Sequence, residues 1–306
     1  MQLNVLHRTS YRFTQPLSNA IQLLRLTPTS CLAQSVLDWR IEVGCDSRLR
    51  ETKDGYGNCV HMLYVDEPVT ELVISATGRV ITEDRAGVVE GLPNDLPSEV
   101  FLRPTVLTAP DEALRPLADS VRNTDDPLSL LHALNAAVHG QMTFDTAVTE
   151  TATSAGESYQ ARRGVCQDFA HIFIAAARMS DIPARYVSGH LYRRDAKRSQ
   201  EAGHAWAEAW VPALGWVAFD PTHGICADDN YIRVATGLDY GDAAPIAGTR
   251  RGGGAETMSV EVEVTQTAPR SQRASQRQSQ RQNRQGQEQS QSQSRGPAAP
   301  EPPRRS

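Results

Sequence analysis

The chain has 306 residues, of which 40% are hydrophobic and 22% charged, and its formal net charge is −5. This length predicts one large hydrophobic core and a second, smaller one. The negative net charge argues against nucleic acid as a specific partner, because phosphate binding depends on an excess of Lys and Arg on one face.

The amino terminus and the cysteines indicate the compartment. The first residues, MQLNVLHRTSYRF, lack the basic start, apolar run and cleavage site of a secretory signal. No stretch is apolar enough to span a membrane. The cysteines have no CxxC spacing and are odd in number, which is typical of a reducing compartment. They are Cys31, Cys45, Cys59, Cys166 and Cys226. We therefore expect a cytoplasmic protein without a membrane partner.

Short alternating or apolar segments rich in Val, Ile, Leu and Tyr fill the first part of the chain, from residue 3 to about residue 82. Turn-forming residues such as DGYGN at 54–58 separate them. This pattern predicts an all-β, sandwich-like domain over residues 1–85.

Helical spacing of apolar residues follows a proline-rich stretch, in DEALRPLADSVR and DPLSLLHALNAAVHG. Asp111 and Asp126 stand where helix caps belong, and Pro127 suits a first helical turn. A third helix is predicted over about 166–180. The strands expected after it are ARYVSGHLY, HAWAEAWV, GWVAFDP, YIRVAT and MSVEVEV. Residues 95–265 are thus expected to form an α+β domain with helices packed on an antiparallel sheet.

Residues 266–306 are rich in Gln, Arg and Ser, and lack aromatic residues. Such a segment buries too little apolar surface to offset its ordering entropy, so we expect a disordered tail. Its arginines permit weak contacts with anionic partners. A solvated tail is the favoured interpretation, and an arm that anchors the chain to nucleic acid is the alternative.

Cys166 is the candidate nucleophile. It lies in GVCQDFAH at the predicted start of a helix. Free N–H groups and the positive end of the helix dipole favour a thiolate there and help to bind an oxyanion forming beside it. The alternative is a small buried hydrophobic residue. Cys31, Cys45 and Cys59 fit that alternative, because they lie in or beside β segments without a recognisable base.

His204 and Asp220 are the candidate base and its orienting carboxylate. His204 begins HAWAEAW, and GWVAFD follows after the turn-forming VPALG, so the two segments are predicted to form an antiparallel hairpin. Reflection across that turn places His204 opposite residues 220–222. A carboxylate beside a histidine fixes its tautomer and stabilises its charged form. The approach of Cys166 to His204 does not follow from the spacing.

A zinc site is the competing interpretation, because cysteine and histidine are the usual zinc ligands. Its candidate residues are Cys166, His171, His190 and His204. Cys166 and His171 are separated by about 140° around a helix of 3.6 residues per turn, so they point apart. Because no C-x-x-C or H-x-x-x-H spacing supports the site, we expect neither a metal nor an organic cofactor.

Other residues near the predicted site receive structural roles or remain open. His171 is interpreted as a histidine that packs the helix or supports the site from behind, and Asp168 as a capping or salt-bridging residue near the helix start. Trp206 and Trp216 either line a substrate groove or belong to the core. The oxyanion donor beyond the Cys166 backbone N–H is not identified.

The motifs GVCQDFAH, IPARYVSGHL and GHAWAEAWVPALGWVAFDPTHG together resemble the core of bacterial transglutaminase-like proteins, which are often named as candidate cysteine proteases. The segments LNVLHRTSYRF and KDGYGNCVH look like the domain that precedes this core, so the resemblance covers most of residues 1–265. It implies that Cys166, His204 and Asp220 form the family's triad. Fold-level analogy does not choose among transglutaminases, amide hydrolases and inactive scaffolds.

We therefore expect amide-bond chemistry on a protein or peptide through an acyl-thioester intermediate. Hydrolysis is favoured over transfer, because nothing visible in the sequence excludes water. The alternatives are protein-glutamine acyl transfer, which would cross-link proteins, and a non-catalytic protein-interaction module.

Overall fold

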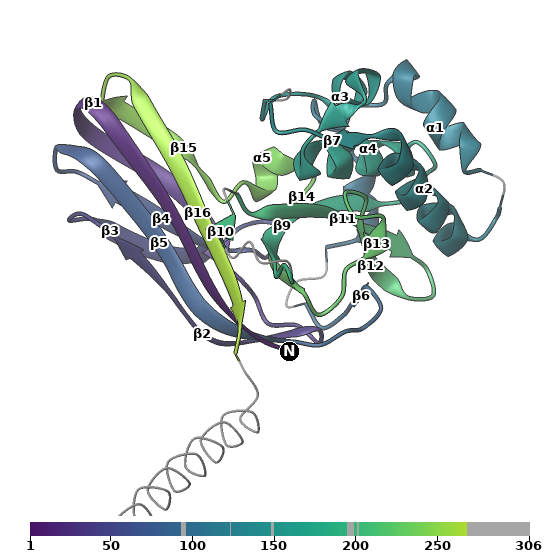
Figure 1. Ribbon diagram of the computed structural model, residues 1–306, viewed down its shortest axis with the longest axis horizontal. Coiled ribbons are helices and arrows are strands. Elements are labelled where there is room, and N and C mark those ends of the chain that lie inside the picture. Colours follow the sequence, from purple (N-terminus) through teal and green to yellow (C-terminus); the bar gives the residue numbers. More distant parts are fainter. Residues whose placement is uncertain (93–95, 123, 148–149, 195–198, 201, 268–306) are drawn as a thin grey trace, which may run out of the picture. The chain divides into compact units, whose positions relative to one another are not determined.

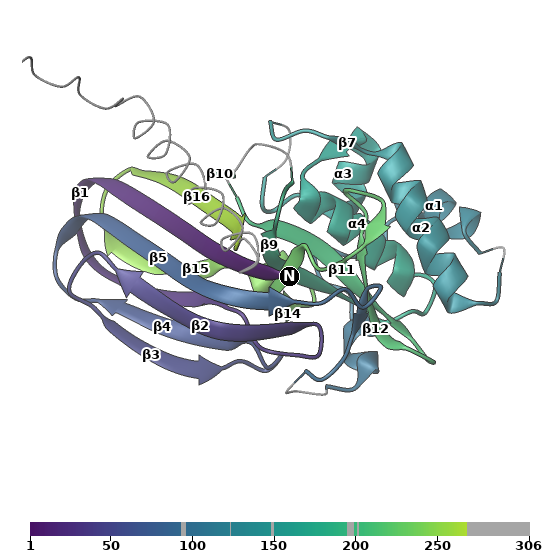
Figure 2. The ribbon, with the colours of Figure 1, turned by 60° about the horizontal axis from the view of Figure 1, so that its bottom comes forward.

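The computed structural model describes residues 1–92, 96–122, 124–147, 150–194, 199–200 and 202–267 (Figures 1 and 2). Residues 1–266 form one compact unit. Within the described residues, no helix is both long enough and apolar enough to cross a membrane. The tail expected over residues 266–306 lies outside the described residues from position 268 onward.

The first sheet is built around one long strand, β1 (Gln2–Thr27), drawn in purple in Figure 1. Eight strands belong to this sheet among the described residues, and all pair antiparallel. The others are β2 (Gln34–Val43), β3 (Arg48–Lys53), β4 (Cys59–Val65), β5 (Val69–Thr82), β10 (Ser199–Gln200), β15 (Ile246–Gly252) and β16 (Glu256–Gln266).

The two halves of β1 have different neighbours, which closes the sheet over its own core. The first half pairs with β5 and β16, and the second half with β4 and β15. Tyr11 of the first half and Leu24 of the second are buried in the same apolar cluster. Alternation of buried and exposed residues along β1 supplies this inner face. The sandwich-like domain predicted from the sequence is confirmed.

The last strands of the described chain pair differently from the prediction. MSVEVEV was expected in the sheet of the second domain, but β16 pairs with β1 from Leu3↔Gln266 to Phe13↔Glu256. Val262 and Val264 are buried in one cluster with residues of β1. An alternating pattern identifies a strand and its buried face but not its partner. The first sheet therefore takes strands from both ends of the described chain, while the boundaries 1–85 and 95–265 stay predictions.

The second sheet carries the hairpin that was predicted to hold His204. Six strands belong to it among the described residues, in the order β13-β12-β11-β9-β14 with β6 beside β12. They are β6 (Val88–Val89), β9 (Ala184–Leu191), β11 (His204–Val211), β12 (Gly215–Asp220), β13 (Ile225–Cys226) and β14 (Tyr231–Gly237).

Helices cover one face of this second sheet (Figure 1). They are α1 (Arg115–Ser120), α2 (Pro127–Gln141), α3 (Ala155–Ala161), α4 (Cys166–Arg178) and α5 (Tyr240–Ala243), with 3-10 turns at Ser98–Leu102 and Glu112–Leu114. A short parallel pair, β7 (Thr143–Phe144) and β8 (Arg163–Gly164), precedes α4. The expected caps are present, since Asp111 accepts from the Ala113 N–H and Asp126 from the Ser129 N–H. The α+β assignment is confirmed.

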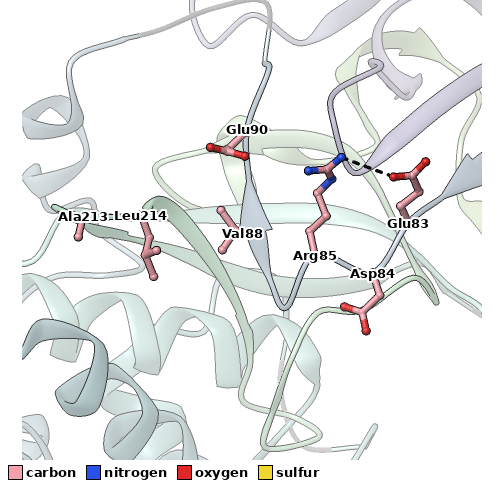
Figure 3. A pocket seen from close by; sticks show the side chains of 7 residues that line it. All are labelled: Glu83, Asp84, Arg85, Val88, Glu90, Ala213 and Leu214. Carbon is pink, nitrogen blue, oxygen red and sulfur yellow. Dashed lines mark ion pairs between the residues drawn. The ribbon is translucent and has the colours of Figure 1, made fainter.

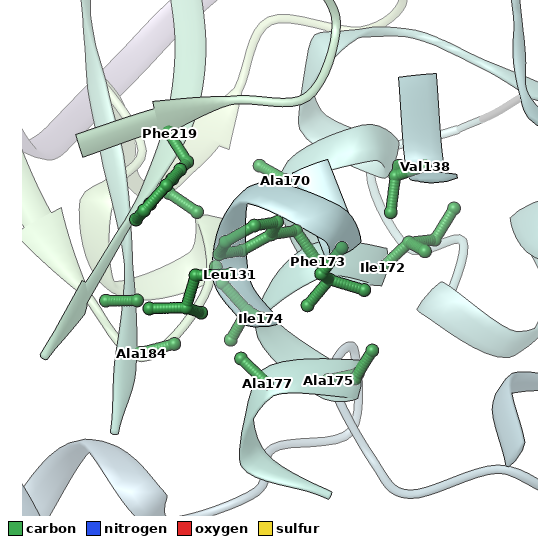
Figure 4. Packing of buried hydrophobic residues seen from close by; sticks show 14 of the residues in the cluster. Leu131, Val138, Ala170, Ile172, Phe173, Ile174, Ala175, Ala177, Ala184 and Phe219 are labelled. Carbon is green, nitrogen blue, oxygen red and sulfur yellow. The ribbon is translucent and has the colours of Figure 1, made fainter. Parts of the chain in front are cut away.

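Helix α4 is the centre of the second core. Nearly all of its residues are buried, between α2 and α3 on one side and β11 and β9 on the other. Phe173 stacks on Phe219 of β12 with ring centroids 5.3 Å apart, and Ile174 and Ala177 lie in the same cluster (Figure 4). Each large apolar side chain buried in this way contributes about 1.5–3 kcal/mol. This packing holds the first turn of α4 against the end of β11 where His204 lies.

Candidate active site

The nucleophile candidate Cys166 is the first residue of α4, and its side chain is half-buried. Val165, the N-cap residue, has an apolar side chain that cannot accept from the first N–H groups of the helix. Asp168 instead accepts from the Val165 N–H at 2.7 Å, which confirms its predicted capping role. A Cβ at Gly164 would lie 2.5 Å from an Asp168 oxygen, so glycine is required for this turn. The local sequence thus places the sulfur at a helix N-terminus.

The β11–β12 hairpin brings His204 to Asp220. Its register runs from Val211↔Gly215 to Ala207↔Phe219, which directs His204 toward residues 220–222 as predicted. The His204 Nε2–H donates to Asp220 Oδ2 at 2.7 Å. The predicted proximity of the two residues is therefore confirmed.

The contact that spacing could not predict joins Cys166 to His204. Cys166 lies close enough to the His204 ring to raise its pKa, together with Asp220. Because Asp220 occupies Nε2, the nitrogen left for the sulfur is Nδ1. Packing of α4 on β11 makes this contact, since Cys166 lies against the same core cluster as Ala205 and Ala207. Three side chains from a helix and two strands, Cys166, His204 and Asp220, thus lie in one row.

Burial and charge set the protonation of this row. Burial lowers the pKa of His204, but the charge and hydrogen bond of Asp220, together with the neighbouring Cys166, outweigh it and raise the pKa to about 10. Burial favours neutral Asp220, yet His204 and then His223 hold the pKa of that carboxyl far below its usual range. Near neutral pH the row therefore contains an imidazolium beside a carboxylate.

Two more side chains bind Asp220, and neither was predicted from the sequence. The His223 Nδ1–H donates to Asp220 Oδ2 at 2.6 Å, and the Tyr231 hydroxyl donates to the same oxygen at 2.7 Å. The backbone N–H groups of Thr222 and His223 donate to Oδ1 at 2.9 and 3.3 Å. The DPTHG turn after the strand is a local signal for His223. Tyr231 has no such signal, because it reaches Asp220 from β14.

The structure does not bring the four residues of the competing zinc interpretation together, because His171 and His190 have partners other than Cys166 and His204. The Nε2 of His171 accepts from the Tyr240 N–H at 3.1 Å. Burial, with a smaller contribution from the Arg178 charge, lowers the pKa of His171 to about 3, which agrees with the packing role predicted for this histidine. His190 lies against His7 instead, with ring centroids 5.4 Å apart.

Among the described residues, two other groups have metal-ligating atoms within 4.8 Å of one another. They are His204, Asp220 and His223, and Glu51, Cys59 and His61. In the first group the facing ring nitrogens already donate to the carboxylate. The second group lies on β3 and β4, in the first sheet. We assign a metal to neither group.

Trp206 and Trp216, which were expected either to line a substrate groove or to belong to the core, are both buried. Trp206 is buried against Tyr231, with ring centroids 5.4 Å apart. Trp216 is buried against Phe101, and the Arg185 guanidinium lies 3.8 Å from its ring centre. Trp206 also lines a small cavity of about 50 Å³, together with Ala218 and Tyr231.

A surface hollow of about 590 Å³ lies at the other end of the hairpin (Figure 3). The Arg85–Glu83 ion pair, at 3.5 Å, crosses one side of it. Its lining residues are Glu83, Asp84, Arg85, Val88, Glu90, Ala213 and Leu214. Since a strand rises about 3.3 Å per residue, the length of β11 separates this hollow from His204. It is therefore not part of the Cys166 site.

Comparison with known proteins identifies the family. Residues 115–221 match the model of the transglutaminase-like superfamily, and residues 3–81 match that of the bacterial transglutaminase-like N-terminal region. An uncharacterized protein of Mycobacterium leprae (strain TN) is 31% identical over 279 residues, covering 87% of this chain and 99% of that protein. Cys166, His204 and Asp220 all lie inside the matched core.

Two further similarities are more distant. A protein-glutamine gamma-glutamyltransferase of Pseudomonas aeruginosa is 29% identical over 94 residues, covering 26% of this chain and 12% of that protein. A solved structure from Cytophaga hutchinsonii, named as a candidate cysteine protease, has a TM-score of 0.71 and 23% identity, covering 88% of this chain and 93% of that chain. The second similarity shows the shared fold. With its matched core and preceding β region, the chain belongs to the transglutaminase-like superfamily.

Proposed function

We propose that this protein is a cysteine-dependent hydrolase that cleaves amide bonds in proteins or peptides. Cys166 is the nucleophile, His204 the acid and base, and Asp220 the group that orients His204. One observation carries the proposal: Cys166, at the first turn of a buried helix, lies beside His204, whose Nε2 is 2.7 Å from a fully buried carboxylate.

The acylation step follows from this geometry. The Cys166 thiolate attacks the carbonyl carbon, an S–C bond forms, and the carbonyl π electrons move to the oxygen. The Cys166 backbone N–H and the helix dipole stabilise that oxyanion. When the oxyanion collapses, the C–N bond breaks and His204 gives its proton to the departing amine. The product is a thioester on Cys166 and a free amine.

Deacylation uses the same groups in reverse. Neutral His204 takes a proton from water as the water oxygen attacks the thioester carbonyl. The C–S bond then breaks, the carboxylic acid leaves, and the thiolate and imidazolium are restored. Asp220 stays ionised throughout and stabilises the charged form of His204.

Hydrolysis is the leading candidate because water has access to the site. Cys166 is half-buried, and the side chain of His223, in contact with Asp220, is 44% exposed. The second candidate is acyl transfer to an amine, which the superfamily match and the likeness to a protein-glutamine gamma-glutamyltransferase favour. Both candidates share the acylation step and differ only in what attacks the thioester.

One assay separates the two candidates. Glutamine-containing protein substrates and a peptide library are incubated with the enzyme in ¹⁸O-labelled water and a labelled primary amine, and mass spectrometry identifies the products. We expect ¹⁸O-labelled carboxylates from the wild type and none from Cys166→Ala. Cys226→Ser is the matched control, because its sulfur lies outside the row of Cys166, His204 and Asp220. A dominant amide product with the labelled amine would refute the hydrolase proposal.

The same experiment tests the alternative that this protein is a non-catalytic interaction module. A chain that binds peptides but yields neither product, with Cys166→Ala binding as the wild type does, would establish binding without turnover. The complete row Cys166–His204–Asp220 supports turnover instead.

We also propose a reducing, cytoplasmic location and no specific nucleic-acid partner. All five cysteines are free thiols in the structure, which supports the first point. Salt-sensitive binding of DNA or RNA that is lost on truncation near residue 267 would contradict the second.

A further inference from the structure

We propose that His223 is a positioning residue of this site, which shields the Asp220 carboxylate from solvent and keeps its charge directed at His204. This inference rests on the proposed function. It assigns His223 a role through Asp220 and not in contact with the substrate.

The two histidines share one carboxylate oxygen. His204 Nε2 lies 2.7 Å from Asp220 Oδ2, and His223 Nδ1 lies 2.6 Å from the same atom. The two rings have centroids 5.3 Å apart. Asp220 is fully buried, whereas 44% of the His223 side chain is exposed. His223 therefore stands between the buried carboxylate and water.

The loop that carries His223 is built to hold it there. Gly224 has a φ of +69°, and its N–H donates to the Asp220 backbone carbonyl at 2.8 Å. A Cβ on Gly224 would lie 3.0 Å from the His139 ring, which packs under the loop. The His139 Nδ1 is 3.0 Å from the Thr222 carbonyl oxygen. The turn and the His139 ring beneath it therefore hold the His223 side chain against the Asp220 carboxylate.

Other polar and titratable groups face the same pair from three elements. Cys166 on α4 faces His204, and the Tyr231 hydroxyl on β14 donates to Asp220. Cys226 on β13 and Asp228, which follows it, act on Tyr231. All these groups are retained in the variants below, so a change in His204 reports on position 223.

The physical argument concerns the dielectric around Asp220. The attraction between Asp220 and protonated His204 varies inversely with the local dielectric constant. Removal of the His223 ring admits water to Oδ2, which raises that constant and competes for the hydrogen bond. The His204 cation then loses part of its stabilisation. Near pH 9 a larger fraction of His204 is then neutral. A neutral imidazole stabilises a neighbouring thiolate less than an imidazolium does.

The test is a nuclear magnetic resonance titration of ¹³C-labelled histidine, which needs no substrate. The His204 signal is assigned by its loss in His204→Gln. In the wild type its pKa is about 10. We expect His223→Ala to lower this pKa by about one unit, which is a tenfold change in the protonation equilibrium. His223→Asn places an amide donor near the Nδ1 position and should restore most of the shift. His132→Ala is the control, because His132 is an exposed histidine of α2 that contacts neither Asp220 nor the loop of His223.

The outcomes are distinguishable. An unchanged or raised pKa of His204 in His223→Ala overturns the inference, and a raised value shows that His223 merely competes for the carboxylate. If His223→Ala does not fold, His223→Gln decides, because its amide extends past the Nδ1 position and should give a lower pKa than His223→Asn. A wild-type His204 that titrates near 6.5 defeats the proposed Cys166–His204–Asp220 row itself. A value near 10 in wild type and variants alike defeats only the role of His223.

Discussion

Acid should destabilise this protein through a buried histidine pair away from the active site. His7 and His190 are each 3% exposed, and both His190 ring nitrogens are without a hydrogen-bond partner in the described structure. Burial lowers the pKa of His7 to about 4. Burial, with a smaller contribution from His7, lowers the pKa of His190 to about 3. The ordinary value for histidine is about 6.5.

The direction in which the free energy of unfolding changes with pH follows from proton uptake. Between about pH 3 and pH 6.5 the unfolded chain holds more protons on these rings than the folded chain does, so the free energy of unfolding rises with pH. The full stability is present above pH 6.5 and is lost as the pH falls below it. At pH 5 each ring is almost fully protonated in the unfolded chain and neutral in the folded chain. The loss relative to pH 8 is then about 2 kcal/mol for each ring, or about 4 kcal/mol for the pair.

The assay is urea unfolding of wild type and His190→Leu at pH 8 and pH 5, followed by tryptophan fluorescence. Leucine removes the titrating ring without leaving a polar atom unpaired, so the pH-dependent loss should shrink by about 2 kcal/mol. His132→Leu, on an exposed position of α2, is the control and should lose as much stability as the wild type. An equal loss in His190→Leu and wild type would refute the reasoning.

Three other substitutions test the site and the core around it. Asp220→Asn should lower the His204 pKa and reduce kcat/KM at neutral pH by about 10²-fold or more, because the amide cannot stabilise the imidazolium; an unchanged rate would remove Asp220 from the mechanism. Gly164→Ala should destabilise the chain by about 1–3 kcal/mol in thermal unfolding, because the methyl group collides with Asp168; a neutral effect would show that the turn is not constrained. Glu208→Gln should cost about 3–5 kcal/mol in urea unfolding, because the buried Arg185 and the half-buried Arg233 lose their shared carboxylate; a loss below about 1 kcal/mol would contradict this.

The parts of the site that the sequence predicts are those fixed by local chain geometry. The helix start at Cys166 follows from the apolar spacing of α4 and from the glycine before it. The hydrogen bond from the Val165 N–H to Asp168 agrees with this helix start. The neighbourhood of His204 and Asp220 follows from a hairpin, whose register depends only on the length of its turn. His223 is also local, because it lies in the DPTHG turn directly after the strand.

The parts that escape prediction depend on packing between distant segments. Cys166 reaches His204 only because α4 packs on β11, and Tyr231 reaches Asp220 only because β14 pairs with β9. The pairing of β16 with β1 joins opposite ends of the described chain, and no local pattern encodes it. His190 likewise resembles a ligand in the sequence and lies in a histidine pair in the structure.

The most direct test of the central claim is competitive alkylation of the native protein at pH 7 with limiting iodoacetamide, followed by mass spectrometry of all five cysteines. We predict that Cys166 reacts first, and that His204→Ala slows it to the rate of Cys31. Cys31 is the internal reference, because it is also a partly buried free thiol. If Cys166 reacts no faster than Cys31 in the wild type, the claim that His204 and Asp220 activate a thiol nucleophile is contradicted.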